Sequence, residues 1–458
     1  MTAVSIPLRP RLRPAVLLAA SLGVVVVSQL VSLGRPAQVL PKPAANAAQA
    51  TVDNPGAPAG SVSSDLAQID HSIKIWTANL AANDKDFYSA TNLGQLYDAR
   101  ARLTGDISDY SRALEALTRA LAIEPSLDAT RVLHARELLA THDFSGALSE
   151  AGEIDARIPD QPAVLAVMGD AQLELGDVDG AEARYTQILA AAPGAPISAR
   201  LARVAFLRGR TADALTLAAQ AVDQSAAAGE SGPAASWYSY LAGTMKVGTG
   251  NPGDALASFD EAVALWPQSY LALAGRGRAL AGLGRYDEAI GAYQAAIAVA
   301  PQPDALTALG DLYALRGDQH SADEQYATVE LIARLAALNQ QIYNRQLALF
   351  SINHDRDQAT ALTLATTELA QRKDIYGWDA YAWALLANGR ATDADAAEEN
   401  ALALGTQDAL LFYHAGAIAQ AAGDPARART MLTAALALPG ALDPLAATNA
   451  QAALDALQ

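Results

Sequence analysis

The sequence predicts an all-α protein built as an α-solenoid of about ten antiparallel helix pairs. Three observations predict this fold class. An alanine recurs at intervals that are mostly 33 to 35 residues, each alanine has companions at fixed offsets, and a proline closes many of the units. One helix pair cannot bury its apolar face alone, so we expect a row of similar pairs that stack on their neighbours.

The alanine ladder is the primary signal. Its positions are Ala113, Ala147, Ala181, Ala214, Ala255, Ala289, Ala322, Ala359, Ala394 and Ala428. Two steps are longer than the rest. The step of 41 residues after Ala214 contains the segment AAAGESGPA at residues 226–234, which predicts an extra loop, and the step of 37 residues follows Ala322.

Each alanine brings companions with a physical role. A small residue stands twelve positions earlier, and an aromatic residue often stands four positions later, as Gly277 and Tyr293 do around Ala289. Apolar residues at three- and four-residue spacing make each half-unit an amphipathic helix. The small residues let two helix backbones approach, and the aromatic side chain fills the gap toward the next unit. A closing proline such as Pro301 ends the unit because proline cannot extend a helix.

A 34-residue period with glycine, alanine, an aromatic residue, alanine and proline in this order resembles the tetratricopeptide repeat. The stretches Ser236–Pro267 and Ser269–Pro301 match best, and Gly169–Pro193 also matches well. The unit around Ala359 departs most from the pattern. Together with its amino-terminal region, described below, the chain resembles a membrane-anchored bacterial protein of this family.

The resemblance spans residues 64–458 and implies the order of the elements. Asp65–Asn83 is expected to form a lead-in helix at the front of the array. The solenoid itself is expected over residues 64–441, and residues 442–458 are expected to form a helix that caps the last apolar face.

The amino-terminal 34 residues predict a membrane-crossing segment. Three arginines at positions 9, 11 and 13 precede Ala15–Leu33, which holds 19 uncharged residues, close to the roughly 20 that a helix needs to cross a bilayer. We expect a cytoplasmic basic end at residues 1–13, an anchor at residues 14–34 and all later residues outside. A cleaved signal peptide is the alternative, although its apolar core usually spans about 7–15 residues. Cleavage would give a secreted, soluble binder of peptide or glycan.

Residues 35–63 predict a disordered tether between the anchor and the solenoid. They hold five prolines and many small residues, without a period that could bury an apolar face. Such a segment behaves as a linker that holds the folded part away from the membrane.

Composition excludes several function classes. The formal charge is −17, and the residues after position 42 carry 27 basic against 49 acidic groups. A surface this acidic repels phosphate backbones, so nucleic acid is not expected as a partner. The chain has no cysteine, which excludes disulfides, thiol catalysis and cysteine-bound metals.

The sequence offers no pattern that carries enzyme chemistry. No HExxH, GxSxG or GxxxxGK motif occurs, and no two of the six histidines have the spacing of a helical metal pair. The segment GDVDGAE at Gly176–Glu182 superficially resembles a calcium loop, but its place in the repeat predicts a turn between helices. We therefore expect no catalytic, cofactor-binding or metal-binding residues. An enzyme with an unrecognised site in the groove remains the rival hypothesis.

The repeat resemblance implies where a partner would bind. In this repeat class the first helices of successive units line a concave wall, and family members that grip acidic tails use clusters of lysine and asparagine, which are missing here. Arginine and aromatic side chains often dominate binding energy. The candidate contacts for a protein or peptide of unknown identity are Arg203, Trp237, Tyr240, Arg278 and Trp383. The competing interpretation of the aromatic side chains is that they pack the core.

Overall fold

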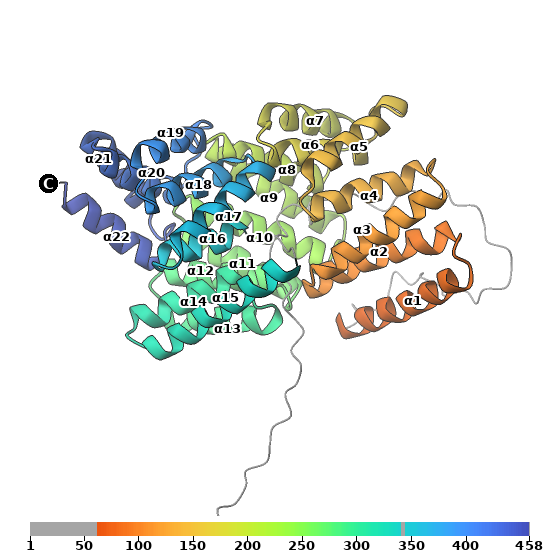
Figure 1. The fold of residues 1–458 in the computed structure, drawn as a ribbon, viewed down its shortest axis with the longest axis horizontal. Helices are drawn as coiled ribbons and strands as arrows, with labels where there is room; N and C mark the ends of the chain where they lie inside the picture. The colour runs from red at the N-terminus through yellow and green to blue at the C-terminus, as the bar shows by residue number, and fades with distance from the viewer. Residues whose placement is uncertain (1–61, 340–343, 458) are drawn as a thin grey trace, which may run out of the picture.

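Residues 62–339 and 344–457 are described by the computed structural model, and within them the chain forms 22 α-helices and no strand (Figure 1). This confirms the predicted all-α fold. The predicted basic end, the anchor and nearly all of the tether fall on residues 1–61, outside the described residues. No helix of the described part combines the length and the apolar character that a membrane span requires.

The helices of the first half follow one another with short connections. Their bounds are α1 (Val62–Ala82), α2 (Phe87–Thr104), α3 (Ser108–Ile123), α4 (Asp128–Ala140), α5 (Phe144–Arg157), α6 (Pro162–Glu174), α7 (Val178–Ala191), α8 (Ala195–Leu207), α9 (Thr211–Ala227), α10 (Gly232–Gly248) and α11 (Pro252–Leu265).

The second half continues in the same way. Its helices are α12 (Tyr270–Gly282), α13 (Tyr286–Val299), α14 (Pro303–Leu315), α15 (Gln319–Asn339), α16 (Asn344–Asn353), α17 (Gln358–Gln371), α18 (Ile375–Ala387), α19 (Ala391–Leu402), α20 (Ala409–Ala422), α21 (Pro425–Leu436) and α22 (Pro444–Asp455).

Ten antiparallel pairs, from α2–α3 to α20–α21, make up the solenoid, and the predicted count of about ten is confirmed. Helix α1 precedes the pairs and α22 follows them, as expected for a lead-in and a closing helix. The predicted extra loop at residues 226–234 is wrong in its extent. The added residues lengthen α9 and α10 to 17 residues each, which leaves only residues 228–231 between the two helices.

Short polar signals fix the turns inside the pairs. Asp177 caps α7, because its carboxylate accepts a hydrogen bond of 2.9 Å from the backbone N–H of Gly180. Gly176 precedes it with φ of 87°, the left-handed region that favours glycine. The predicted interhelical turn at GDVDGAE is thus confirmed. Asp143 caps α5 in the same way, with 2.8 Å to the N–H of Gly146.

The alanine ladder is buried, with one correction. Nine of the ten predicted alanines are fully buried on the second helix of their pair, but Ala359 is exposed. The buried alanine of that pair is Ala361, which lies 33 residues before Ala394. The sequence placed this position wrongly because the long helix α15 and residues 340–343 shift the pattern by two residues.

In four units the aromatic residue packs on the glycine of its own first helix. A Cβ on Gly169 would lie 2.5 Å from the ring of Tyr185, and a Cβ on Gly243 would lie 2.7 Å from the ring of Phe259. The Phe259 ring also lies against Gly275 of the following unit. The predicted role of the aromatic residue, filling the gap toward the next unit, is therefore only part of what it does.

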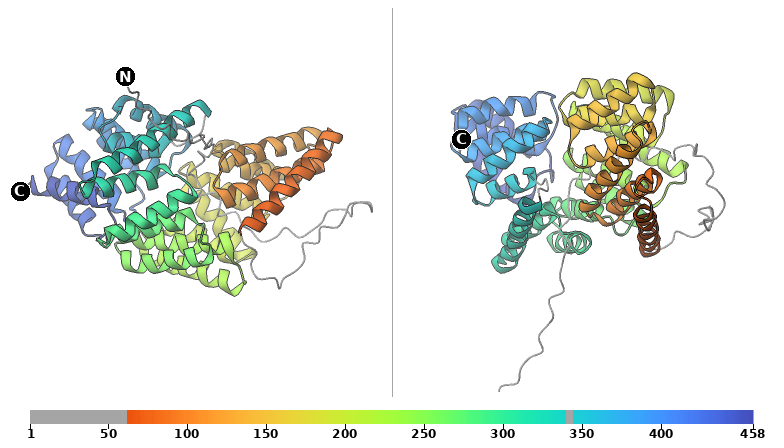
Figure 2. Two further views of the ribbon diagram at one scale, coloured as in Figure 1. Left: turned by 90° about the horizontal axis from the view of Figure 1, so that it is seen from below. Right: turned by 45° about the vertical axis from the view of Figure 1, so that its right-hand side comes forward.

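The pairs coil so that the first helices form the inner row. Helix α10 contacts α8 and α12, and α18 contacts α16 and α20, whereas successive second helices do not approach one another comparably in the described part. The coil brings distant parts of the chain together. Figure 2 shows the helices near residues 370–410 beside those near residues 150–210. There the backbone N–H of Lys373 donates to the carbonyl oxygen of Glu174 at 3.0 Å.

Candidate functional site

The five predicted contact residues all lie on first helices. They are Arg203 on α8, Trp237 and Tyr240 on α10, Arg278 on α12 and Trp383 on α18. The structure spreads them along the inner row and does not bring them into one cluster, and their surroundings differ sharply.

Trp237 belongs to the core. Its exposed fraction is 2 %, and its ring lies edge-on to Tyr238 at 5.5 Å between centroids. It packs with residues of α8 and α9 in one hydrophobic cluster. A side chain this deeply buried has no surface for a partner in this conformation, which favours the competing interpretation that Trp237 packs the core. The amphipathic pattern could not show this, because α10 is packed on both sides.

Arg203 is engaged inside the molecule. Its Nη2 atom lies 2.7 Å from Glu174 Oε1, while Arg372 Nε approaches Glu174 Oε2 at 2.8 Å from a distant part of the chain. Burial opposes a charge on Glu174, but the two guanidinium groups outweigh it and lower the pKa of Glu174 to about 2. Arg203 thus holds a buried carboxylate, which sequence alone did not indicate.

Tyr240 and Arg278 differ in how much of the side chain is exposed. Tyr240 is half-buried beside Phe259, 6.0 Å between ring centroids, and burial raises its pKa. Arg278 is exposed, and its Nη2 atom donates to the carbonyl oxygen of Ala441 at 3.1 Å, 163 residues later in the chain. Of the five residues, Arg278 is the one with a substantially exposed side chain.

Trp383 is half-buried and held by polar and stacking contacts. Its Nε1 atom donates to Asn353 Oδ1 at 2.9 Å, and its ring stacks on His414 with 4.1 Å between centroids and 13° between planes. His414 in turn bonds Asp379 at 2.8 Å, and both are buried. The part of the Trp383 ring that remains accessible is therefore held rigidly.

Two aspartates that follow the small residue of a first helix form buried or half-buried clamps. Asp170 accepts hydrogen bonds from Tyr185 Oη at 2.8 Å and from two nitrogens of Arg200, both at 2.8 Å. These three side chains are almost completely buried, so Asp170, which the repeat pattern places on the inner wall, serves packing instead. Both aspartates directly follow a glycine, and this Gly-Asp dipeptide is the sequence signal from which the two clamps could have been found.

Asp311 repeats the arrangement with a histidine. It accepts from Tyr326 Oη at 2.7 Å and lies 2.8 Å from His354 Nε2, whose Nδ1 lies 2.8 Å from the carbonyl oxygen of Phe350. Burial disfavours the charged imidazole, but the bond to Asp311 outweighs it and raises the pKa of His354. Both ring nitrogens are occupied, so this triad joins α14 and α15 to the residue that follows α16 and leaves no nitrogen free as a base.

A buried acid on α19 has no hydrogen-bond partner. Both carboxylate oxygens of Glu398 are buried and unpaired. Burial and the nearby Asp379 raise the pKa of Glu398 to about 10, so the group is neutral at physiological pH. Within the described residues, no group of three His, Asp or Glu side chains is arranged to hold a metal ion.

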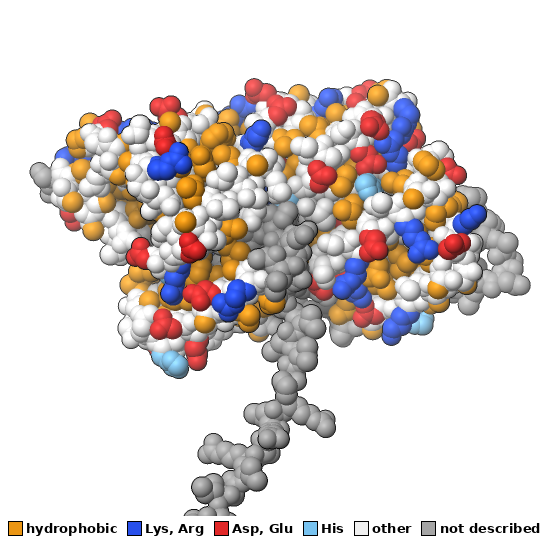
Figure 3. Space-filling view, viewed as in Figure 1, with side chains coloured by type: hydrophobic (Ala, Val, Ile, Leu, Met, Phe, Trp, Pro, Cys, Tyr) orange, Lys and Arg blue, Asp and Glu red, His pale blue; other side chains and the backbone are white. Residues whose placement is uncertain are grey.

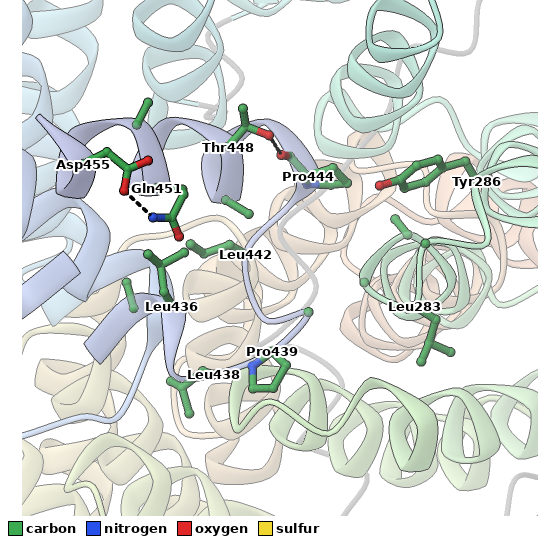
Figure 4. A pocket seen from close by; sticks show the side chains of 17 residues that line it. Leu283, Tyr286, Leu436, Leu438, Pro439, Leu442, Pro444, Thr448, Gln451 and Asp455 are labelled. Carbon is green, nitrogen blue, oxygen red and sulfur yellow. Dashed lines mark hydrogen bonds between the residues drawn. The ribbon is translucent and has the colours of Figure 1, made fainter. Parts of the chain in front are cut away.

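An open pocket of about 880 Å³ lies between the α12–α13 turn and α22 (Figure 4). Tyr286 points across it toward Pro444, while Gln451 is turned to Asp455, to which it donates a bond of 2.8 Å. None of the five predicted residues lines this pocket. The face in Figure 3 intersperses acidic and basic side chains among apolar ones, without a dominant patch of one charge.

Sequence comparison supports the repeat assignment. Family models described as tetratricopeptide repeat match residues 138–204, 240–305 and 277–328. A comparison with curated proteins finds no match.

Comparison with solved structures returns matches at low identity. The APC/C hetero-tetramer Cut9–Hcn1 is 16% identical, with 86% of this chain and 94% of that chain covered and a TM-score of 0.32. Yeast Tom70 is 13% identical, with 86% and 95% covered and a TM-score of 0.36. A tetratricopeptide repeat protein from Parabacteroides merdae is 16% identical, with 60% and 98% covered and a TM-score of 0.32.

Proposed function

We propose that the chain, which family models match as tetratricopeptide repeat over residues 138–204, 240–305 and 277–328, is a non-catalytic scaffold that binds a protein or peptide segment on its inner row of helices. Proteins of this class bind other proteins. The observation that carries the proposal is that helix pairs and their end helices account for nearly all of the described residues, with an exposed arginine and two half-buried aromatic rings on the inner row.

The proposed contacts are Arg278, Tyr240 and Trp383, with Arg203 as a fourth whose availability depends on the ion pair with Glu174. One nitrogen of Arg278 donates to a backbone carbonyl, and among the described residues Arg278 forms no ion pair. Its remaining N–H groups can donate to carbonyl or carboxylate oxygens of a bound segment. The rings of Tyr240 and Trp383 offer apolar surface on either side of it along the row.

Site-specific photo-crosslinking tests this proposal. A photo-reactive amino acid placed at Arg278 or at Trp383 of the full chain, expressed in its own cells, is expected to give a discrete protein adduct. The matched control is the same amino acid at Thr216, which is exposed on the second helix α9. Equal adducts from all three positions, or none from the inner positions, would rule out the inner row as the binding surface.

We further propose that residues 14–34 anchor the scaffold in a membrane and that the repeats lie outside the cytoplasm, within an envelope assembly. The run of 19 uncharged residues after three arginines supports this. Protease added to intact cells is expected to digest the repeats. Protection until lysis would contradict the outside location, and a mature chain lacking 34 or more residues by mass spectrometry would favour the secreted alternative.

A further inference from the structure

The late repeats meet the repeats that contain α6, α8, α10 and α12 along a line of contacts that we call the seam. It is formed by the turns that follow α6, α8, α10 and α12, which contact the loops that precede α18, α20 and α22. The contacts join residues that are separated by roughly 160 to 200 positions, as with Lys373 and Glu174 or Arg278 and Ala441. The seam thus joins repeats that are not neighbours in the array.

Backbone groups meet directly across the seam. The N–H of Lys373 donates to the carbonyl oxygen of Glu174 at 3.0 Å, and the hydroxyl of the buried Thr406 donates to the carbonyl oxygen of Leu207. These carbonyls belong to the last turns of α6 and α8, where a helix leaves carbonyl groups without partners of its own. The loops therefore satisfy acceptors that the first helices leave open.

A glycine stands at each point of closest approach. A Cβ on Gly176 would lie 2.6 Å from the carbonyl oxygen of Lys373, and a Cβ on Gly282 would lie 2.6 Å from that of Gly440. The other two contacts of this kind are Gly209 with Gly405 and Gly250 with Leu438 and Pro439. Any side chain at these four positions would push the two parts of the coil apart.

Arg372 is the one charged side chain from the loops that enters the opposite part. It is almost completely buried, its Nε lies 2.8 Å from Glu174 Oε2, and its guanidinium lies 5.1 Å from the centre of the Phe144 ring. Glu174 is shared with Arg203 on its other oxygen. Withdrawal of Arg372 would therefore leave Glu174 with a partner, so the carboxylate would not become an unpaired buried charge.

The seam differs in kind from the packing within each part. Neighbouring pairs stack helix against helix, whereas across the seam loops rest on turns, and only α14 and α22 approach one another as helices to a comparable degree in the described part. The apolar part of the seam consists of Ile375, Ala401 and Leu411, which join the buried cluster of the first part, and of partly buried side chains packed against that cluster, namely Tyr376, Trp378, Leu402 and Leu404. The rest of the seam is polar and is made by loops on turns, and partly polar interfaces within one chain commonly permit relative motion.

We propose that the seam is a latch that opens and closes as one unit while the repeats stay folded, and that its closed state holds Arg203 and the inner row around it in place. The consequence for partner binding rests on the proposed function, but the latch itself does not. Opening removes Arg372 from Oε2 of Glu174, and of the two guanidinium groups only Arg203, on Oε1, then remains at that carboxylate.

Distance measurements on spin-labelled protein test the latch. Because the chain has no cysteine, Asp179→Cys and Lys373→Cys place labels on exposed positions at the two sides of the seam. In this background we expect one short distance. Arg372→Ala and, at the far end of the seam, Gly282→Ala are each expected to add a longer distance, with at least about a tenfold rise in the open-to-closed ratio. The far-ultraviolet helical signal should not change.

The matched control is Gly291→Ala, a helical glycine whose Cβ would meet nothing within 4 Å. It should leave the distance unchanged. If Gly282→Ala leaves the label distance at residues 179 and 373 unchanged, the seam does not move as a unit. If the distance grows only together with loss of helix, the seam is a fixed part of the core. Either result overturns the proposal, and neither bears on the scaffold function, because no partner is present.

Hydrogen exchange of the unaltered protein gives a second measurement that needs no variant. The amide of Lys373 bonds across the seam, whereas the amide of Leu175 bonds Ala171 at the end of α6. If the latch opens alone, Lys373 exchanges at least about tenfold faster than amides in the middle of α6. Equal rates that respond equally to denaturant would mean that seam and repeats open together and would overturn the latch.

Discussion

At the scale of single residues, some polar side chains of the inner row are buried and serve packing, whereas others are exposed at the surface. Asp170 is enclosed by Tyr185 and Arg200, while Arg278 remains exposed three helix pairs further along. Both follow a glycine of the first helix. A carboxylate there can reach the tyrosine of the second helix, whereas an arginine is long enough to extend past it.

The clamp at Asp170 predicts a strong effect of a small change. Asp170→Asn keeps the shape but leaves Arg200 buried without a counter-charge, so the free energy of unfolding should fall by about 3–5 kcal/mol. Asp260→Asn, which breaks the exposed pair with Arg276, should change it by less than about 1 kcal/mol. Denaturant titration of both variants measures the difference, and similar losses would show that the buried clamp has no special weight.

Glu398 predicts a pH dependence of opposite sign from an ordinary carboxylate. Its pKa is about 10 in the folded chain and about 4.3 when unfolded. The contribution of Glu398 to the free energy of unfolding is fully present below the unfolded pKa and is lost as pH rises toward the folded pKa. Glu398→Gln should therefore stabilise the protein at pH 8 by on the order of 2 kcal/mol and have little effect at pH 4.

The control for Glu398 is its neighbour Glu399, which is exposed on the same helix. Glu399→Gln should change the free energy of unfolding by less than about 0.5 kcal/mol at either pH. A gain at pH 8 that is the same for both variants would assign the effect to net charge and not to burial.

At the scale of the elements, close helix pairs depend on glycine opposite an aromatic ring. Gly169→Ala places a methyl group 2.5 Å from the Tyr185 ring and should destabilise the fold by about 1–3 kcal/mol. Gly152→Ala, in a helix with nothing within 4 Å of the new group, should stabilise it by about 0.5–1 kcal/mol. Thermal melts of the two variants should shift in opposite directions, and a shared direction would contradict the packing argument.

The closing helix α22 covers the apolar face of the last pair. Leu432, Ala435 and Leu442 lie in one buried cluster with Ala446 and Ala450 of α22. Removal of residues 444–458 should expose this cluster and raise hydrogen exchange in α20 and α21 before the rest of the chain. Removal of residue 458 alone is the control. Unchanged exchange after the longer truncation would show that α22 is not needed as a cap.

At the scale of the whole molecule, the seam changes how the array should unfold. An open solenoid approximates a sum of nearest-neighbour terms, so its ends fray independently. Here Arg372, Lys373 and Thr406 join the late repeats to the middle of the first part. The inner row is therefore shaped by contacts across the coil as well as by the stacking of neighbours.

The sequence by itself determined the helix pairs, their number and their order. Spacing of apolar residues, caps such as Asp177 and turn glycines such as Gly176 act over a few residues, so a reader of the chain can find them. The family resemblance added the inner row as the binding surface, which stays a proposal for Arg203, Tyr240, Arg278 and Trp383.

Only the tertiary structure decided which inner positions are accessible and which parts of the coil touch. Trp237 and Arg278 have the same kind of position in the repeat, yet one is buried and the other exposed. The physical reason is that each pair turns by a small angle on the last, and these angles accumulate over many pairs. The repeat spacing fixes the rotation from one helix pair to the next. The sum of these rotations over many pairs decides that residue 373 meets residue 174.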